Sequence, residues 1–362
     1  MKTKTAEPLR LHDVLQGMKA EEIKHTARTI GFGLPSPTKK DAIVRRMETA
    51  LVQEADAVLD GLTIHELRLV CKMLGGGGSI KIPIYAKDTI SLYTMNLMGS
   101  EVVEDTEDGV ELLITLPAEM ADAFRPIAVD MLAAKEHDGL EEVEQAAAGI
   151  LAVCGTMPFD TLIEQLSRLF PDRSEGWLRL NTKRKYLFKG QSPREDSRTP
   201  YAATPFLGDS AHQIFFLRHA GEQTETYRQA DKCEAMSMGT MPLPHLDTPS
   251  ASDMLQIYID AFGKAEGEQA FHHVWRRAQI QFPKAMIESI LQEVCETEED
   301  ISEELVATIR QFLSHIPRWS LYGYSLADRA KAAGVSKDKL AETLERNYFR
   351  KGLEIVLNKE DI

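Results

Sequence analysis

Two stretches with helical apolar period, separated by a segment with two glycines and two prolines, constrain the start of this chain more than any other feature. In the first stretch, the apolar side chains that share one helix face are Met18, Ile23, Ala27 and Ile30. In the second stretch they are Ile43, Met47 and Leu51. Gly31 ends the first helix, and Pro35 and Pro37 exclude a continuous helix between the two. The sequence therefore predicts a helix, an extended loop and a second helix that ends near Leu51.

The second helix is expected to begin at Lys39, because Thr38 and Asp41 have the spacing of a capping pair. The run from Met18 to Met47, MKAEEIKHTARTIGF and then TKKDAIVRRM, resembles the helix-extended-loop-helix modules of the SAP and Rho-N-terminal families. The resemblance implies contacts with DNA or RNA through cations on both helices, beside helix N-terminal amides. The implied residues are Lys24, Arg28, Lys39, Lys40, Arg45 and Arg46. The alternative is that these cations are the solvated side chains of a module used for protein contact.

A helix and a glycine run follow this module. Thr63 and Glu66 have the spacing of a capping box, which predicts a helix from Thr63 to Leu74. Residues 75–78 are four glycines, but Lys81 lacks the spacing and the following hydroxyl of a phosphate-binding loop. The glycines therefore predict a helix stop and a turn.

The segment after the glycines predicts a small sheet. Residues 80–85 form a short apolar segment, and another helix is expected after it. Two strands, at residues 100–105 and 110–117, flank Asp108-Gly109, which is a strong hairpin signal. Helix, strand, helix and hairpin, in that order, favour a winged-helix-like module.

A related order of elements follows. Residues 139–153 predict an Ala-rich helix, and residues 157–170 predict an amphipathic one. Residues 176–190 alternate basic with apolar side chains, which predicts a basic hairpin that could serve as a secondary nucleic-acid patch. An ordinary half-buried hairpin explains the same alternation. The cations of the patch are Arg179, Lys183, Arg184, Lys185 and Lys189.

The C-terminal part is predicted to be helical. Loops are expected at residues 190–205 and 236–252, from their Ser, Pro and Gly content. Helices are then expected at residues 253–262, 266–281, 283–295 and 303–316, with two more near the end. The last two have helix-turn-helix spacing, with Gly334 at the turn and Ser336 as a cap, but their charges are balanced rather than basic.

Two short runs, residues 149–166 and 315–328, resemble uncharacterised bacterial proteins that often end in a SEC-C zinc module. The second run is HIPRWSLYGYSLAD, in which a Pro-x-Trp segment leads to a glycine and a helix start. The chain lacks the clustered cysteines of that module, so the resemblance implies neither zinc nor a known activity.

Charge is unevenly distributed along the chain. The net charge is −14 over 362 residues, yet residues 1–50 hold ten Lys and Arg against six Asp and Glu, which leaves −18 for the rest. Because binding to phosphates requires a positive surface, this balance favours the N-terminal segment as the main nucleic-acid contact.

Composition narrows the class of protein further. Hydrophobic residues make up 43% and charged residues 27%, which is typical of a folded globular protein and excludes a disordered one. No apolar run of bilayer length or signal peptide is present, so we expect a cytoplasmic protein without membrane contact. The sequence contains no hydrolase, metalloprotease or dinucleotide-binding motif, so we expect no enzyme activity, no cofactor and no metal site. Four widely spaced cysteines predict buried, reduced thiols: Cys71, Cys154, Cys233 and Cys295.

These observations predict a mainly α fold with small β-hairpins, in four modules. The expected modules are SAP-like (1–55), winged-helix-like (56–125), helix plus hairpin (126–205) and helical (206–362). The favoured function is a non-enzymatic, nucleic-acid-associated protein of a regulatory kind, whose basic N-terminal module tethers an acidic body to DNA or RNA. The alternative is a protein-interaction or adaptor protein whose winged-helix-like units are architectural.

Overall fold

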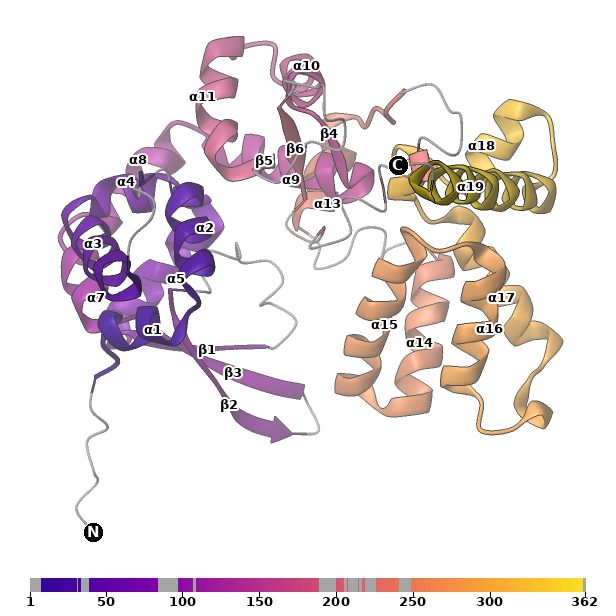
Figure 1. The fold of residues 1–362 in the computed structure, drawn as a ribbon, viewed down its shortest axis with the longest axis horizontal. Coiled ribbons are helices and arrows are strands. Elements are labelled where there is room, and N and C mark those ends of the chain that lie inside the picture. The colour runs from indigo at the N-terminus through magenta and orange to yellow at the C-terminus, as the bar shows by residue number, and fades with distance from the viewer. Residues whose placement is uncertain are drawn as a thin grey trace. The chain divides into compact units, whose positions relative to one another are not determined.

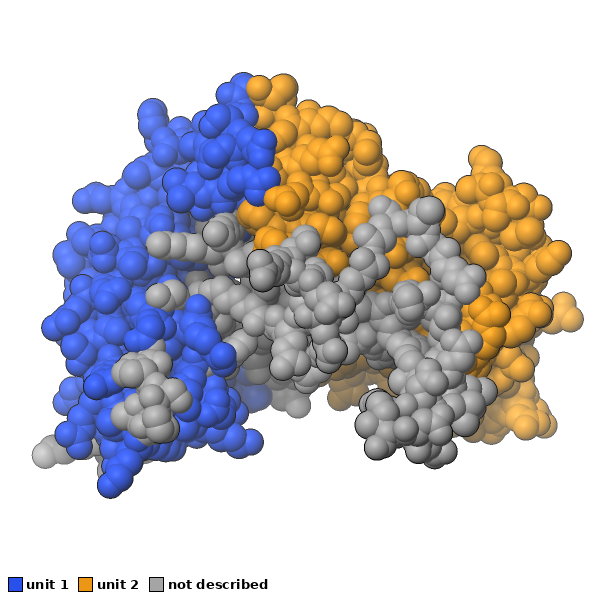
Figure 2. All heavy atoms as spheres, turned by 45° about the horizontal axis from the view of Figure 1, so that its top comes forward, with its two compact units in different colours: residues 1–144, 172–189 blue, residues 145–171, 190–362 orange. Residues whose placement is uncertain are grey.

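The structure, a computed structural model, divides into two compact units. Unit 1 comprises residues 1–144 and 172–189, and unit 2 comprises residues 145–171 and 190–362 (Figure 2). The structure describes residues 8–30, 32–33, 39–83, 97–106, 109–188, 200–204, 207, 214, 217–218, 226–240 and 249–360. These residues are mainly helical with a few short antiparallel strands, as the sequence predicts. No helix among them has both the length and the apolar character needed to cross a bilayer.

Unit 1 consists of short helices and one three-stranded sheet (Figure 1). Its helices are α1 Leu11–Gly17, α2 Ala20–Ile30, α3 Lys40–Gln53, α4 Ala55–Asp60, α5 Ile64–Gly75, α7 Ala118–Phe124, α8 Ala128–His137 and α11 Glu175–Tyr186. Its strands are β1 Ser79–Pro83, β2 Gly99–Thr106, β3 Gly109–Thr115 and the two-residue β5 Leu187–Phe188. Helix α9 Leu140–Cys154 begins in unit 1 and continues in unit 2.

One hydrophobic core in unit 1 includes side chains from Leu11 to Ala128. Helix α3 contributes to it and packs on α1, α2, α4 and α7. The start of α1 is bound to α7, because the Glu119 carboxylate accepts hydrogen bonds from the Leu11 backbone N–H at 2.9 Å and from Nη1 of the Arg10 guanidinium at 3.1 Å. The predicted helices on either side of the loop at residues 31–39 are present as α2 and α3, and they share their core with later elements. The Thr38 cap lies outside the described residues.

The predicted α5 and its cap are confirmed. The Glu66 N–H donates to the Thr63 hydroxyl at 3.2 Å, and the Thr63 N–H donates to the Glu66 carboxylate at 2.8 Å. The glycine turn after α5 is also confirmed, because Gly77 and Gly78 have φ of 84° and 100° and the Gly78 N–H donates to the Met73 carbonyl at 2.7 Å. A side chain at either glycine would be strained.

The sheet of unit 1 has β3 at its centre, with β1 and β2 antiparallel on either side. Strands β2 and β3 pair from Gly99↔Thr115 to Thr106↔Gly109, which confirms the predicted hairpin. The helix expected between β1 and β2 lies outside the described residues.

Unit 2 contains a larger set of helices and a small two-stranded pairing, β4 with β6. Its helices after α9 are α10 Phe159–Leu169, α13 Lys232–Thr240, α14 Pro249–Phe262, α15 Lys264–Ala278, α16 Pro283–Val294, α17 Glu303–His315, α18 Leu326–Ala333 and α19 Lys337–Glu360. Its strands are β4 Thr156–Pro158 and β6 Tyr201–Ala203, and two 3₁₀ turns are η3 Glu298–Asp300 and η4 Trp319–Leu321. The helices predicted from residue 253 onward are all present, with ends that differ from the expected ones by a few residues.

The loop predicted for residues 236–252 is wrong in its described parts. Helix α13 extends to Thr240 and α14 begins at Pro249. Helix α13 instead packs closely on α9: an added Cβ at Gly239 would lie 1.8 Å from the Gln145 carbonyl oxygen. Small residues that are typical of a loop therefore serve close helix packing here. Part of the other predicted loop, Tyr201–Ala203, is strand β6.

Residues 317–325 form a tight turn in unit 2. A β-bridge joins Pro317 to Ser325, the Arg318 N–H donates to the Tyr324 carbonyl at 3.1 Å, and the Gly323 N–H donates to the Arg318 carbonyl at 3.0 Å. Trp319 is buried in this turn and packs edge-on against Trp275, with ring centroids 5.7 Å apart. The Pro-x-Trp run of the sequence is thus a rigid element of the unit 2 core.

Candidate nucleic-acid interface

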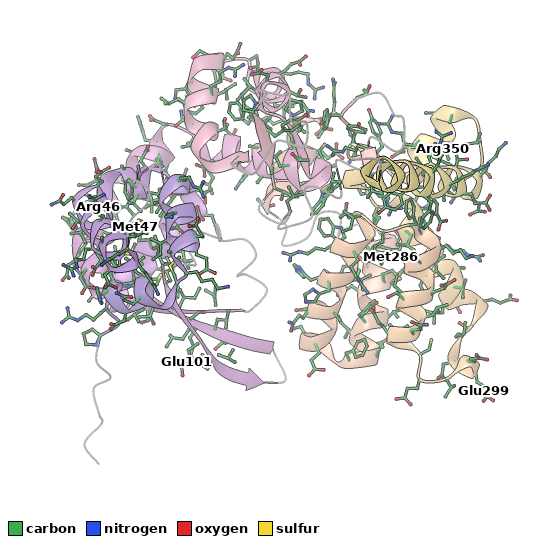
Figure 3. The ribbon with its side chains drawn as sticks, in the orientation of Figure 1. Arg46, Met47, Glu101, Met286, Glu299 and Arg350 are labelled. Carbon is green, nitrogen blue, oxygen red and sulfur yellow. The ribbon has the colours of Figure 1, made fainter. Side chains whose placement is uncertain are left out.

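Helix α3 separates its apolar and basic residues onto different faces. Four side chains face the core and are buried: Ile43, Val44, Met47 and Leu51. Arg45 and Arg46 are exposed. Met47, which Figure 3 labels beside its neighbour Arg46, is fully buried. Because the buried face fixes the rotation of the helix, the two arginines are held toward solvent.

The start of α3 adds a third exposed cation. Lys39 is the N-cap residue, with extended backbone (φ −58°, ψ 145°), and its carbonyl accepts the Ala42 and Ile43 N–H groups at 2.9 and 3.2 Å. Its side chain is exposed. Within the described residues, no carboxylate forms an ion pair with Lys39, Arg45 or Arg46. These three residues are called the α3 cations below.

The other three predicted contact residues already have partners within the module. Lys24 forms an ion pair with Glu21 at 2.8 Å, and its hydrogen bond lowers the pKa of that exposed carboxyl. Arg28 donates from Nε to the Lys24 carbonyl at 3.3 Å. Lys40 donates from Nζ to the Gln16 carbonyl. A phosphate would have to compete with these contacts, so the α3 cations are the most accessible part of the predicted surface.

The basic hairpin predicted for residues 176–190 is wrong, because this segment is mostly helix α11. Leu178 and Thr182, four residues apart, are both buried, and the Thr182 hydroxyl donates to the Leu178 carbonyl at 2.7 Å. A strand would have placed Leu178 and Leu180 on the same face, yet Leu180 is 76% exposed. The burial of Leu178 and Thr182, at helical spacing, therefore determines the structure of this segment more than its local alternation of basic and apolar residues does.

Without the hairpin, the main argument for a secondary nucleic-acid patch in this segment is lost. Arg179 forms an ion pair with Glu175 at 2.8 Å, one helical turn earlier. The guanidinium carbon of Arg173 lies 4.6 Å from the centroid of the Trp177 ring, so this ring already forms a cation–π contact within the chain. The side chains of Lys183, Arg184 and Lys185, and all of Lys189, lie outside the described residues.

Within the described ranges, cysteines and metal-ligating side chains form no other candidate site. No group of three or more His, Cys, Asp or Glu in the described part of the chain could hold a metal ion. The four cysteines were predicted to be buried, but only Cys154 is buried, and Cys233 is exposed. Burial raises the pKa of the Cys154 thiol to about 12, so this thiol is protonated and unreactive at neutral pH.

The helix-turn-helix spacing near the C-terminus is matched by α18 and α19. Gly334 ends α18 in the left-handed region at φ 65°, and Ser336 accepts the Lys339 N–H at 3.3 Å, which confirms the predicted cap. Lys337 and Lys339 are exposed, but Asp338 and Glu342 are exposed beside them. The face is therefore mixed in charge.

Two arginines that no motif singles out are buried in unit 2. Arg218 and Arg318 are each 4% exposed. Their only signal in the sequence is that each follows an apolar run, IFFL before Arg218 and Ile316-Pro317 before Arg318. Such runs do not reveal whether the cation is buried or solvated.

No protein-family model matches the chain, no curated protein matches its sequence, and no solved structure matches its fold. The similarity of residues 18–47 to SAP and Rho-N-terminal modules, and that of residues 149–166 and 315–328 to SEC-C-associated proteins, therefore stay predictions.

Proposed function

We propose that this chain is a non-enzymatic, nucleic-acid-associated protein whose N-terminal module tethers an acidic body to DNA or RNA. The observation that supports the proposal is the exposure of the α3 cations on a helix whose opposite face is locked into the core. Such cations contact phosphates without reading the base sequence, and they position a protein rather than select a site.

The charge balance sets the expected strength of this tether. Three phosphate contacts on double-stranded DNA give a slope of log affinity against log salt of about −3, at roughly −0.9 per contact. The remainder of the chain carries −18 and repels the polyanion. Binding should therefore be weak, strongest at low salt and largely independent of base sequence.

The test is fluorescence anisotropy with labelled single- and double-stranded DNA and RNA over a salt series. The variant replaces the α3 cations with alanine: Lys39→Ala, Arg45→Ala and Arg46→Ala. A matched control removes the same number of exposed charges from α18 and α19: Lys331→Ala, Lys337→Ala and Lys339→Ala. We expect the first variant to lose most of the binding and most of the salt slope, and the control to keep both.

Two outcomes would contradict the proposal. If the wild-type chain shows no binding at low salt, the module does not bind nucleic acid, and the adaptor alternative is favoured. That alternative also draws support from the packing of α3 on α7, which makes the module part of a larger core. If only the control variant loses binding, the interface belongs to α18 and α19 instead.

A further inference from the structure

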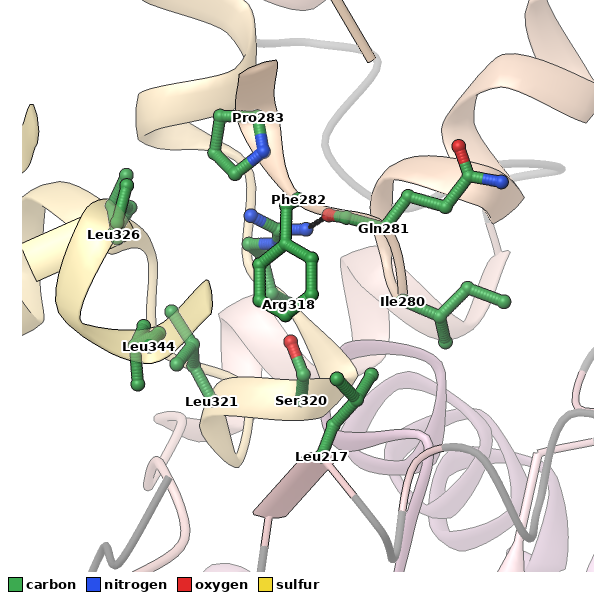
Figure 4. A pocket seen from close by; sticks show the side chains of 11 residues that line it. Leu217, Ile280, Gln281, Phe282, Pro283, Arg318, Ser320, Leu321, Leu326 and Leu344 are labelled. Carbon is green, nitrogen blue, oxygen red and sulfur yellow. Dashed lines mark hydrogen bonds between the residues drawn. The ribbon is translucent and has the colours of Figure 1, made fainter. Parts of the chain in front are cut away.

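The small pocket around Arg318 in unit 2 combines apolar walls with one buried cation. It lies between the turn at residues 317–325, the start of α16 and the helices α18 and α19 (Figure 4). Its apolar walls include Leu217, Ile280, Phe282, Leu321, Leu326 and Leu344. Arg318 and Ser320 are among the few polar residues that line it.

Arg318 is buried, and no described residue supplies a counter-ion for it. Its side chain donates from Nη2 to the Gln281 carbonyl, whereas its buried Nε has no hydrogen-bond partner in the described part of the chain. No described carboxylate lies within ion-pair distance of it. Burial lowers the pKa of this guanidinium to about 10, so it still carries its charge at neutral pH. A buried charge without a partner is costly, and it points to an anion that completes the site.

The backbone, not the guanidinium, holds the turn in place. The Arg318 carbonyl accepts N–H groups from Leu321 and Gly323, both at 3.0 Å, and the Arg318 N–H is bound to Tyr324. The turn would therefore close with another side chain at this position. The charged group is available for a ligand while its Cα is rigidly placed.

Two further groups at the pocket suit an anion. Phe282 and Pro283, which line it, are the N-cap and first residue of α16, a helix of 12 residues without a side-chain cap in the described structure. The positive end of the helix dipole is thus close to the guanidinium. Ser320 adds a hydroxyl that has no hydrogen bond to any other described residue, since only its backbone N–H is bound, to the Gln279 carbonyl at 3.3 Å.

The size and walls of the pocket narrow the class of ligand. The pocket is partly open, and its inner space of about 20 Å³ has room for one small polar group such as a carboxylate, while the rest of a ligand would extend toward the opening. A planar carboxylate also matches the fork of an arginine, which can donate two parallel hydrogen bonds. The surrounding leucines and Phe282 would contact an apolar body attached to that carboxylate.

We propose that this pocket binds the carboxylate of a small apolar monocarboxylic acid, with Arg318 as its counter-ion. The acid places its carboxylate between Arg318, Ser320 and the start of α16, and its hydrocarbon part against Leu321, Leu326 and Leu344. This site does not involve the α3 cations, so its test is independent of the nucleic-acid proposal.

The test compares acids with neutral isosteres on the full-length wild-type chain. Isothermal titration calorimetry and thermal denaturation are run with sodium butyrate and sodium benzoate, and with butyramide, benzamide and sodium phosphate at matched ionic strength. We expect both acids to bind and to raise the melting temperature as their concentration rises. The amides and phosphate should bind at least tenfold more weakly, because they lack the planar charged group.

The variant Arg318→Met removes the charge and keeps much of the side-chain volume. We expect it to fold, because no carboxylate is left unpaired, and to bind butyrate at least tenfold more weakly than the wild type. The matched control Arg310→Met removes an exposed arginine of α17 and should leave binding unchanged.

Three results would overturn the proposal: no acid binds the wild-type chain, the amides bind as well as the acids, or Arg318→Met binds butyrate unchanged. The comparison of acids with amides needs no variant, so it decides the matter even if Arg318→Met does not fold.

Discussion

The start of α5 in unit 1 depends on a local side-chain contact, whereas the turn at residues 317–325 in unit 2 also depends on a side chain that is distant in sequence. Thr63 and Glu66 are three residues apart and cap each other. The turn has local backbone hydrogen bonds of its own and one long-range contact, in which Arg218 donates from Nε to the Trp319 carbonyl at 2.8 Å, across 101 residues of sequence. Contacts of the first kind are visible in a sequence, whereas contacts of the second kind are not.

The two regions also differ in how many partners depend on one side chain. Besides Trp319, Arg218 donates to the carbonyls of Thr156 at 3.0 Å and Cys154 at 2.6 Å, and it lies over the Tyr322 ring at 4.5 Å. The Thr63 cap serves one helix terminus. Loss of a long-range hub should therefore cost much more than loss of a local cap, and the following variants test that ordering.

The largest effect is expected for Arg218→Met. Removing the guanidinium takes a donor from three buried carbonyls, of which that of Trp319 keeps the Tyr322 N–H at 3.3 Å, and each group left unsatisfied costs about 1–3 kcal/mol. We expect a loss of about 3–5 kcal/mol or failure to fold. Urea denaturation followed by tryptophan fluorescence measures it, because Trp275 and Trp319 both lie in unit 2.

Arg310→Met, which removes an exposed arginine of the same unit, is the matched control and should change stability by less than about 0.5 kcal/mol. A cost below about 1 kcal/mol for Arg218→Met would show that Arg218 is not a hub.

The next effect concerns the contact between α9 and α13. An alanine Cβ at Gly149 would lie 1.9 Å from the Ala235 carbonyl oxygen, which is backbone and cannot move without shifting the helix. We expect Gly149→Ala to lose about 2–3 kcal/mol through overpacking, as measured by thermal denaturation. Gly176→Ala in α11 meets nothing within 4 Å and should be neutral or stabilising by up to about 1 kcal/mol. Equal, small effects of both variants would mean that the helices do not need this close approach.

Elements whose signals lie within a few residues could be predicted from the sequence. The α5 cap, the β2–β3 hairpin and the helices beyond residue 253 are of this kind. Helix α11 could not be predicted in this way, because its local alternation favoured strands, whereas the burial of Leu178 together with Thr182 selected a helix. The extension of α13 to Thr240 is decided in the same way, by its packing on α9.

In the candidate sites, too, the features that depend on nearby residues could be predicted, and those that depend on distant residues could not. The exposure of Arg45 and Arg46 follows from the apolar period of α3, and the Lys24–Glu21 pair follows from a spacing of three residues. The contact of Lys40 with Gln16 depends on how α1 packs on α3. The burial of Arg318 depends on α16, α18 and α19 together, so it could not be predicted.

A smaller effect is expected for the local cap of α5. Thr63→Ala removes the hydroxyl that accepts the Glu66 N–H and should cost about 1 kcal/mol. Thr63→Ser keeps an oxygen at the same place and should recover most of that loss. Chemical denaturation of both variants, followed by far-ultraviolet circular dichroism, provides the comparison. A cost as large as that of Arg218→Met would remove the distinction between local and long-range contacts.

The smallest effect on stability is expected for Arg45→Ala combined with Arg46→Ala. Both side chains point to solvent, and neither forms an ion pair with a described residue, so the free energy of unfolding should change by less than about 0.5 kcal/mol. Met47→Ala, at the next position but fully buried, should cost about 2–5 kcal/mol, because it leaves a cavity in the core. Thermal denaturation of the three proteins measures both effects.

A loss above about 1 kcal/mol in the double arginine variant would show that these residues support the fold. In that case, a loss of nucleic-acid binding in the triple alanine variant could reflect unfolding rather than lost phosphate contacts. A neutral double variant, next to a strongly destabilised Met47→Ala, would show that α3 keeps its structural residues on one face. Its arginines would then be free to act on a partner.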